Sequence, residues 1–180
     1  MNDSKDRFPG AILLPYGDHE PQIAEDVYVA PGAAIIGDVT IGSEASVWFN
    51  TTIRGDVQPI RIGARTSIQD NSVMHATEGW APTIVGEDCV VGHNVILHGC
   101  TLGDRVLIGM GTIILDAATV GDDVLIGAGS LVTARTEVPS GVLMMGRPAK
   151  VKRELTDLER ESIKLGAVHY VHKTHAYRGD

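Results

Sequence analysis

Aliphatic residues recur at every sixth position over most of this 180-residue chain. Nineteen positions between residues 23 and 138 follow the pattern: Ile23, Val29, Ile35, Ile41, Val47, Ile53, Ile62, Ile68, Met74, Val85, Val91, Leu97, Leu102, Ile108, Ile114, Val120, Ile126, Val132 and Val138. A period of six fits neither an α-helix nor a flat hairpin sheet. It suits short strands joined by tight corners, where each strand places one aliphatic side chain inside a solenoid. The repeat therefore predicts an all-β solenoid.

Glycine follows the aliphatic residue at eight of these positions, among them Ile41, Ile108 and Ile126. A glycine there fits a corner at which the chain must turn without a Cβ in the way. The pattern resembles the hexapeptide repeat, whose family fold is a left-handed parallel β-helix with three rungs per turn. The resemblance implies the handedness, because the usual rule for parallel crossovers would favour the right hand.

The C-terminal segment changes period. No proline occurs from Thr156 to Tyr177, and Thr156 with Glu159 forms a capping box. Five residues fall on one face at helical spacing: Ile163, Ala167, Tyr170, Val171 and Thr174. We expect a hexapeptide-repeat β-helix domain over residues 1–152 and, over residues 153–180, a C-terminal helix that packs back on it.

Charge and composition narrow the range of partners. The formal net charge is -8, whereas proteins that bind nucleic acid or anionic membranes gain their affinity from clustered lysine and arginine. No segment approaches about 18 continuous apolar residues, and the start has no apolar run typical of a signal peptide. We therefore expect a soluble cytoplasmic protein that acts on a small molecule. Its two cysteines, Cys89 and Cys100, are expected to be core residues.

The six-residue step fails in three places. The steps are nine residues from Ile53 to Ile62, eleven from Met74 to Val85 and five from Leu97 to Leu102. Breaks in a regular solenoid usually mark inserted loops, and such loops tend to carry function. The first break contains Arg54 and Asp56, the second begins with His75, and the third begins with His98.

These breaks set the register of two histidines. If the step from Met74 to Val85 is one rung that carries a five-residue insertion, Met74 and Leu97 lie three rungs apart, which is one full turn. His75 and His98 then stack on the same edge, about 4.7–4.9 Å apart. Two imidazoles so placed can share one metal ion.

His93 belongs to a different face, because it is the second residue after the rung position Val91. Five extended residues span up to roughly 16 Å, so His93 and His98 of one chain are not expected to share a metal. His93 is better used by a neighbouring chain. This register predicts a homotrimer with a metal site at each subunit interface. An ordinary surface role is the alternative for any single histidine.

Four motifs carry a more specific resemblance. They are Ile53-Arg54-Gly55-Asp56, Ile68-Gln69-Asp70 followed five residues later by His75, Val91-Gly92-His93-Asn94, and Leu97-His98-Gly99-Cys100. In order and spacing they resemble the signature of the gamma-class carbonic anhydrase family over essentially the whole chain. By that resemblance, His75, His93 and His98 match the three metal ligands. Arg54 and Asp70 match a buried ion pair near the site.

The resemblance also implies roles for other polar residues. Gln69 matches the residue that orients the metal-bound water, and Asp56 matches a carboxylate of the subunit-interface network. Asp70 is expected to engage Arg54 rather than act as a base. A purely structural salt bridge is the alternative for Arg54. Tyr170 offers a hydroxyl if the terminal helix returns over the site, and plain packing is its alternative.

Independently of the family, three neutral imidazoles leave a divalent metal with an open position for water, as in catalytic zinc sites. Such an ion lowers the pKa of its water to about 7, carbonic anhydrase being the type case. The resulting hydroxide can attack carbon dioxide to give bicarbonate. Zn2+ is the expected cofactor, with Fe2+ or Co2+ as alternatives, because imidazole suits several first-row metals.

Proton release sets a limit on this reaction. Fast hydration needs a mobile acid or base on the rim of the site, and founding members of the family carry an acidic loop for it. Here Val57 stands where their pattern has a glutamate, and Glu78 is the only carboxylate in the loop after His75. The sequence therefore predicts a metal site with slow turnover, in which Glu78 is the candidate proton shuttle.

Two other functions fit the same fold. A hexapeptide acyltransferase or thioesterase that acts on coenzyme A thioesters needs one catalytic histidine and no metal. A non-catalytic family member would bind the metal without turnover. Metal content separates the first of these from a carbonic anhydrase, and a hydration assay separates the second.

Overall fold

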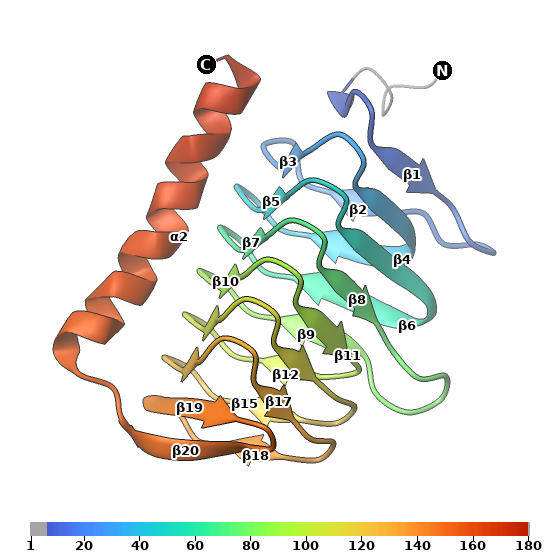
Figure 1. The fold of residues 1–180 in the computed structure, drawn as a ribbon. Helices are drawn as coiled ribbons and strands as arrows, with labels where there is room; N and C mark the ends of the chain where they lie inside the picture. The colour runs from blue at the N-terminus through green and yellow to red at the C-terminus, as the bar shows by residue number, and fades with distance from the viewer. Residues whose placement is uncertain (1–6, 180) are drawn as a thin grey trace.

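Short parallel strands stack turn upon turn along one axis, and the long helix α2 (Asp157–Arg178) runs beside them (Figure 1). The computed structural model describes residues 7–179. The strands form a parallel β-solenoid of about 7 turns, which the C-terminal helix follows. The β-helix predicted from the six-residue repeat is therefore confirmed, together with its terminal helix.

The strands line three faces. The helix-side face contains β3 (Tyr28–Val29), β5 (Ser46–Val47), β7 (Ser67–Ile68), β10 (Val90–Val91), β13 (Leu107–Ile108), β16 (Leu125–Ile126), β19 (Val142–Gly146) and β20 (Ala149–Glu154). The histidine face contains β1 (Ile12–Leu14), β8 (Val73–His75), β11 (Ile96–His98), β14 (Ile113–Ile114) and β17 (Leu131–Val132). The third face contains β2 (Gln22–Ile23), β9 (Thr83–Val85), β12 (Thr101–Leu102), β15 (Thr119–Val120) and β18 (Glu137–Val138). The long strands β4 (Ala34–Ile41) and β6 (Thr52–Ile62) run round a corner and join the last two faces.

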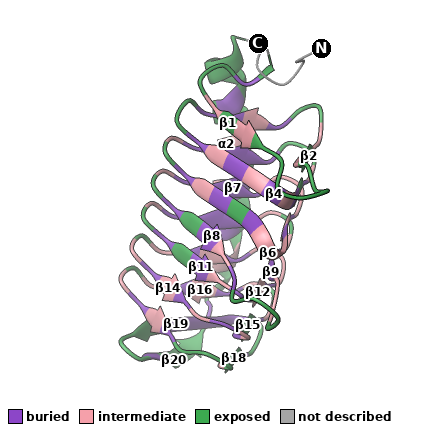
Figure 2. Ribbon diagram, turned by 90° about the vertical axis from the view of Figure 1, so that its right-hand side faces the viewer, coloured by how far each residue is buried: buried purple, intermediate pink, exposed green. Residues whose placement is uncertain are grey.

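The aliphatic positions of the repeat stack in files inside the solenoid. On the histidine face, one such file pairs Ile35, Ile53, Met74, Leu97, Ile114 and Val132 in successive turns, all at 0% exposure. Full burial of each such side chain contributes about 1.5–3 kcal/mol. Figure 2 shows how buried and more exposed residues alternate along β4 and β6, as expected of strands with one face in the core.

The repeat glycines are required by the close approach of neighbouring turns. A Cβ at Gly86 would lie 2.4 Å from the carbonyl oxygen of Gly103 in the next turn. The left-handed corner positions are a separate set, and asparagine holds three of them, Asn50, Asn71 and Asn94, with φ between 56° and 59°. Asparagine tolerates this region better than most residues. The expectation that glycine keeps a Cβ out of the way is thus met, for reasons of stacking rather than of φ.

Helix α2 (Asp157–Arg178) begins at the predicted capping box. The side chain of Thr156 accepts a hydrogen bond from the backbone N–H of Glu159, and the carboxylate of Glu159 accepts one from the backbone N–H of Thr156. The helix packs beside β5, β7 and β10 and buries Ile163, Ala167 and Thr174, all on the predicted face. No helix within residues 7–179 has the length and apolar character needed to cross a lipid bilayer.

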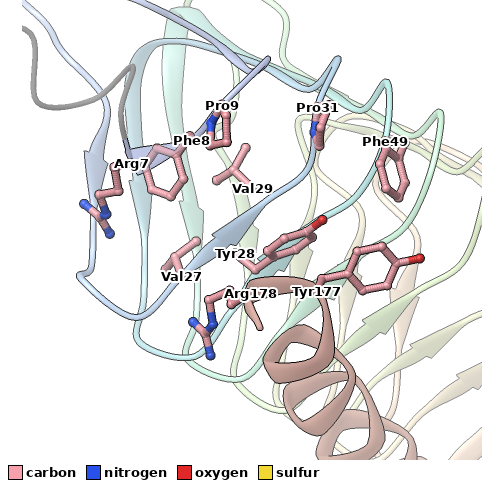
Figure 3. A pocket seen from close by; sticks show the side chains of 10 residues that line it. All are labelled: Arg7, Phe8, Pro9, Val27, Tyr28, Val29, Pro31, Phe49, Tyr177 and Arg178. Carbon is pink, nitrogen blue, oxygen red and sulfur yellow. The ribbon is translucent and has the colours of Figure 1, made fainter. Parts of the chain in front are cut away.

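The far end of α2 is tied to the first turns. The guanidinium of Arg178 donates to the carbonyl oxygen of Asp26 at 2.6 Å. A cavity of about 680 Å³ lies at this junction, and Figure 3 shows Tyr28, Phe49 and Tyr177 among its walls. Burial, together with the neighbouring Tyr177 hydroxyl, raises the pKa of Tyr28. None of the residues with a predicted role lines this cavity, so it marks the anchoring of the helix rather than the candidate site.

Candidate metal centre

The register argument for His75 and His98 is confirmed. These residues end β8 and β11, and they are directly paired because Met74 pairs with Leu97. Their side chains point out of the same face. Nδ1 of His75 lies 3.3 Å from Nε2 of His98.

Both histidines use their other ring nitrogen to contact a carboxylate. Nε2 of His75 lies 2.9 Å from Oδ1 of Asp56, and Nδ1 of His98 lies 3.1 Å from both oxygens of Asp116. An ionised carboxylate only accepts hydrogen bonds, so in a neutral imidazole the contacting nitrogen carries the hydrogen. The facing nitrogens, Nδ1 of His75 and Nε2 of His98, therefore present lone pairs to each other.

Two facing lone pairs repel unless a cation lies between them. In a tetrahedral zinc site with Zn–N bonds of about 2.0–2.1 Å, two ligand nitrogens are about 3.3–3.4 Å apart. The 3.3 Å between Nδ1 of His75 and Nε2 of His98 matches this edge. The pair thus fits two corners of a tetrahedral metal site, and its carboxylate partners are those that orient metal-binding histidines.

Asp56 comes from β6, the strand beside β8. Burial alone would raise its pKa, but hydrogen bonds from Arg54 and His75 outweigh burial and hold the pKa of Asp56 below its ordinary value. Asp56 therefore stays ionised and keeps His75 in one tautomer.

Asp116 is a residue that the sequence reasoning missed. Burial would raise its pKa, but hydrogen bonds from His98 and from Thr77 hold the pKa of Asp116 below its ordinary value. The sequence does contain an indication of this contact, in the lengths of two corresponding steps. The step from Leu97 to Leu102 is five residues, whereas the step from Ile114 to Val120 in the next turn is six. The longer corner places Asp116 beneath the shorter one, against His98.

His93 lies on a different face from His75 and His98, as predicted, and the structure shows that this is the helix-side face. His93 follows β10, and its Nδ1 lies 2.7 Å from Oδ2 of Asp70. This contact lies within ion-pair distance and leaves Nε2 on the other side of the ring. Each of the three histidines thus has a carboxylate close to one ring nitrogen, and its other ring nitrogen is available to a metal.

The ion pair expected between Arg54 and Asp70 is not formed within the chain, and it stays a prediction for the contact between chains. Arg54 pairs instead with Asp56, two residues further along β6, so that both side chains emerge on the same side of the strand. Asp70 follows β7 on the helix-side face and contacts His93. The two residues belong to different faces of the solenoid.

Gln69 and Tyr170 join His93 in a groove of about 360 Å³ between α2 and the helix-side face. Gln69 is 5% exposed. Burial and the negative charge of Asp70 raise the pKa of Tyr170, so its hydroxyl keeps its proton near neutral pH. The helix therefore does return over His93, as the role suggested for Tyr170 requires.

Glu78 lies outside both groups. It is exposed in the loop between β8 and β9, beside Thr77, whose backbone N–H points to Asp116 at 3.4 Å. Trp80 lies in the same loop, and the guanidinium carbon of Arg135, from the turn between β17 and β18, lies 5.2 Å from the centre of its ring. A cation over an indole face is attractive and fixes the outer part of the loop.

Cys89 and Cys100 are free thiols in the interior. Burial raises the pKa of each to about 12. They are therefore inert core residues and play no part in the candidate site.

Comparison with known proteins places the chain in a family. The family described as bacterial transferase hexapeptide (six repeats) matches residues 20–55, 82–115 and 99–134. A probable carbonic anhydrase from Methanocaldococcus jannaschii is 53% identical over 149 residues, covering 83% of this chain and 93% of that protein. Mitochondrial gamma carbonic anhydrase 2 from Arabidopsis thaliana is 41% identical over 164 residues, covering 88% of this chain and 59% of that protein. The chain belongs to the gamma-class carbonic anhydrase family.

One solved structure of a similar chain is named as an acetyltransferase rather than as a carbonic anhydrase. A crystal structure from Bacillus cereus, of a presumed acetyltransferase, has 45% sequence identity and a TM-score of 0.92, and it covers 94% of this chain and 98% of that one. This gamma-class chain is therefore similar both to proteins named as carbonic anhydrases and to one named as an acetyltransferase. Only the residues of the candidate site can distinguish these two functions.

Within one chain of this gamma-class protein, the candidate residues form two separate groups. No group of three or more metal-binding side chains occurs among residues 7–179. His75 and His98 form one half with Asp56, Asp116 and Arg54 on the histidine face. His93 forms the other half with Asp70, Gln69 and Tyr170 on the helix-side face.

Proposed function

We propose that this protein is a metal-dependent carbonic anhydrase that converts carbon dioxide to bicarbonate. The observation that carries the proposal is the shared arrangement of His75, His93 and His98. Each has one ring nitrogen against a carboxylate and the other available. A single acylation base would need one such histidine, whereas a catalytic metal needs three.

The two halves of the site complete each other across a subunit interface. His75 and His98 supply two nitrogens from one chain, and His93 supplies the third from its neighbour in a cyclic homotrimer. The surface around the pair supports this assembly. Val73 and Ile96 pair directly, project on the same side as the histidines and are 38% and 36% exposed. Exposed apolar side chains next to an incomplete polar site are typical of an interface.

A metal held by these three histidines supplies a Lewis acid that lowers the pKa of a bound water to about 7. The chain's own residues prepare its place. Asp56 and Asp116 fix the rings of His75 and His98, and Asp70 fixes that of His93. Gln69 offers an amide for orienting a small polar group in the groove beside His93.

The first test is metal content. Protein purified without chelator is expected to contain about one zinc, iron or cobalt ion per chain, three per trimer, because each interface holds one site. Elemental analysis combined with light scattering measures both quantities. A metal-free trimer that nevertheless hydrates carbon dioxide would contradict the proposal.

Glu78→Ala tests the proton shuttle. Its exposed carboxylate can carry a proton from the site to solvent. We expect the variant to slow hydration about tenfold in dilute buffer and much less in concentrated imidazole, because external buffer replaces a lost shuttle. Stopped-flow rates at both buffer concentrations measure the difference. Equal losses in the two buffers would exclude Glu78 as the shuttle, and Glu137→Ala, also exposed, serves as a control.

An acyltransferase or thioesterase acting on coenzyme A thioesters is the second candidate, favoured by the name of the similar Bacillus cereus structure. Turnover of acetyl coenzyme A by the metal-free protein would support it. A family member that binds metal without turnover would show full metal content and no hydration.

The two buried free thiols fit a reducing compartment, in line with the cytoplasmic location we expect.

A further inference from the structure

The groove beside His93 runs beneath α2. One wall is a line of helix residues at four-residue spacing, Ser162, Gly166 and Tyr170. The other wall is the helix-side face of the solenoid, mainly apolar where Val90, Leu107, Ile108 and Met110 line it. The polar side chains that line it are those of Gln69, His93, Ser162 and Tyr170.

Gly166 is the unexpected residue of this wall. Glycine inside a helix is destabilising relative to alanine. A Cβ at Gly166 would lie 3.5 Å from Cγ2 of Val90, which is an ordinary van der Waals contact. By contrast, a Cβ at Gly109 across the groove would lie 2.4 Å from the backbone nitrogen of Ala128. Packing therefore demands glycine at 109 and does not demand it at 166.

We propose that Gly166 keeps the groove open as the access route by which carbon dioxide reaches the metal site. This inference rests on the proposed function and assigns a residue to substrate delivery. Carbon dioxide is small, linear and without a net dipole, so it suits a narrow passage with aliphatic walls. Bicarbonate, a hydrated anion, is poorly suited to the same walls.

Gly166→Ala and Gly166→Leu make the central test, because alanine should raise stability while it lowers activity, and leucine should lower activity further. Alanine is expected to raise the melting temperature by about 2–4 °C, since it favours the helix and meets no clash. For hydration, kcat/KM is expected to fall about twofold with alanine and about tenfold or more with leucine, which fills the groove. Ala176→Leu adds similar bulk at an exposed position of the same helix and should leave kcat/KM unchanged.

Gly166→Cys gives a second measurement that does not need the metal. The thiol lines the groove, whereas Cys89 and Cys100 are buried with a pKa of about 12 each and should not react. Methyl methanethiosulfonate should label one thiol per chain in the metal-free protein, as seen by mass spectrometry. In the metal-loaded protein, the added S-methyl group should lower kcat/KM, and a reducing agent should restore it.

The outcomes separate this inference from the function on which it rests. Full kcat/KM in a Gly166→Leu trimer with normal metal content would overturn the access route and leave the proposed function intact. An unlabelled Gly166→Cys thiol in folded protein would show that the groove is closed, which also overturns it. A metal-loaded wild-type protein that fails to hydrate carbon dioxide would instead overturn the proposed function.

Discussion

Two inactive variants, His93→Ala and His98→Ala, are expected to recover activity when they are refolded together. An interface that takes His75 and His98 from the first variant and His93 from the second has all three ligands. Random assembly of equal amounts makes about three quarters of the trimers mixed, and each mixed ring has one such interface in three. About a quarter of all sites should therefore regain metal and activity, measured by elemental analysis and stopped-flow hydration.

A matched pair of variants gives the control for this experiment. His75 and His98 are paired on adjacent strands of one chain, so His75→Ala and His98→Ala both damage the same half of the site. Mixtures of these two variants should recover nothing. Recovery in this control, or none with His93→Ala and His98→Ala despite mixing shown by mass spectrometry of differently tagged chains, would refute ligand sharing between subunits.

Loss of the Asp116 carboxylate is expected to weaken metal binding by about 10–100-fold, the usual effect of removing the carboxylate that holds a metal-binding histidine. Asp116→Ala should weaken metal binding by an amount near the upper end of this range. Asp116→Asn should weaken it by an amount near the lower end, because the amide oxygen still accepts a hydrogen bond from Nδ1 of His98. Competition between the metal-free variants and a zinc-binding dye measures the affinities.

Asp18→Asn serves as the control for Asp116, since Asp18 is exposed in a turn far along the chain from His75, His93 and His98. Its zinc affinity should equal that of the wild type. If Asp116→Ala also kept wild-type affinity, the contact between Asp116 and His98 would be a surface hydrogen bond without a role in metal binding.

The repeat allowed the solenoid register to be predicted because each step places one side chain inside. Counting the eleven-residue step as one rung correctly paired Met74 with Leu97, and hence His75 with His98. The same count correctly placed His93 on another face. The capping box of Thr156 and Glu159 is a local sequence pattern, so the start of the helix was also predicted correctly.

The partners of the histidines were not predictable in the same way. Asp116 lies in a stretch of regular six-residue steps, so a search of the breaks passes over it. Which carboxylate a side chain reaches depends on the direction in which it leaves its strand. Arg54 and Asp56 leave the same side of β6, and for this reason Arg54 contacts Asp56 within the chain, which the sequence did not predict.

The 22-residue helix α2 spans about 33 Å, and about 7 turns at roughly 4.8 Å per turn occupy nearly the same height. One end of α2 follows β20, and the other binds the first turns through Arg178 and Asp26, as the chain path in Figure 1 shows. The length of the helix is therefore matched to the height of the solenoid. A whole turn of the solenoid gained or lost in evolution must be matched by about three helix residues, or Tyr170 is carried out of line with His93. The position of the turn that carries His93 is thereby coupled to the lengths of both the solenoid and the helix.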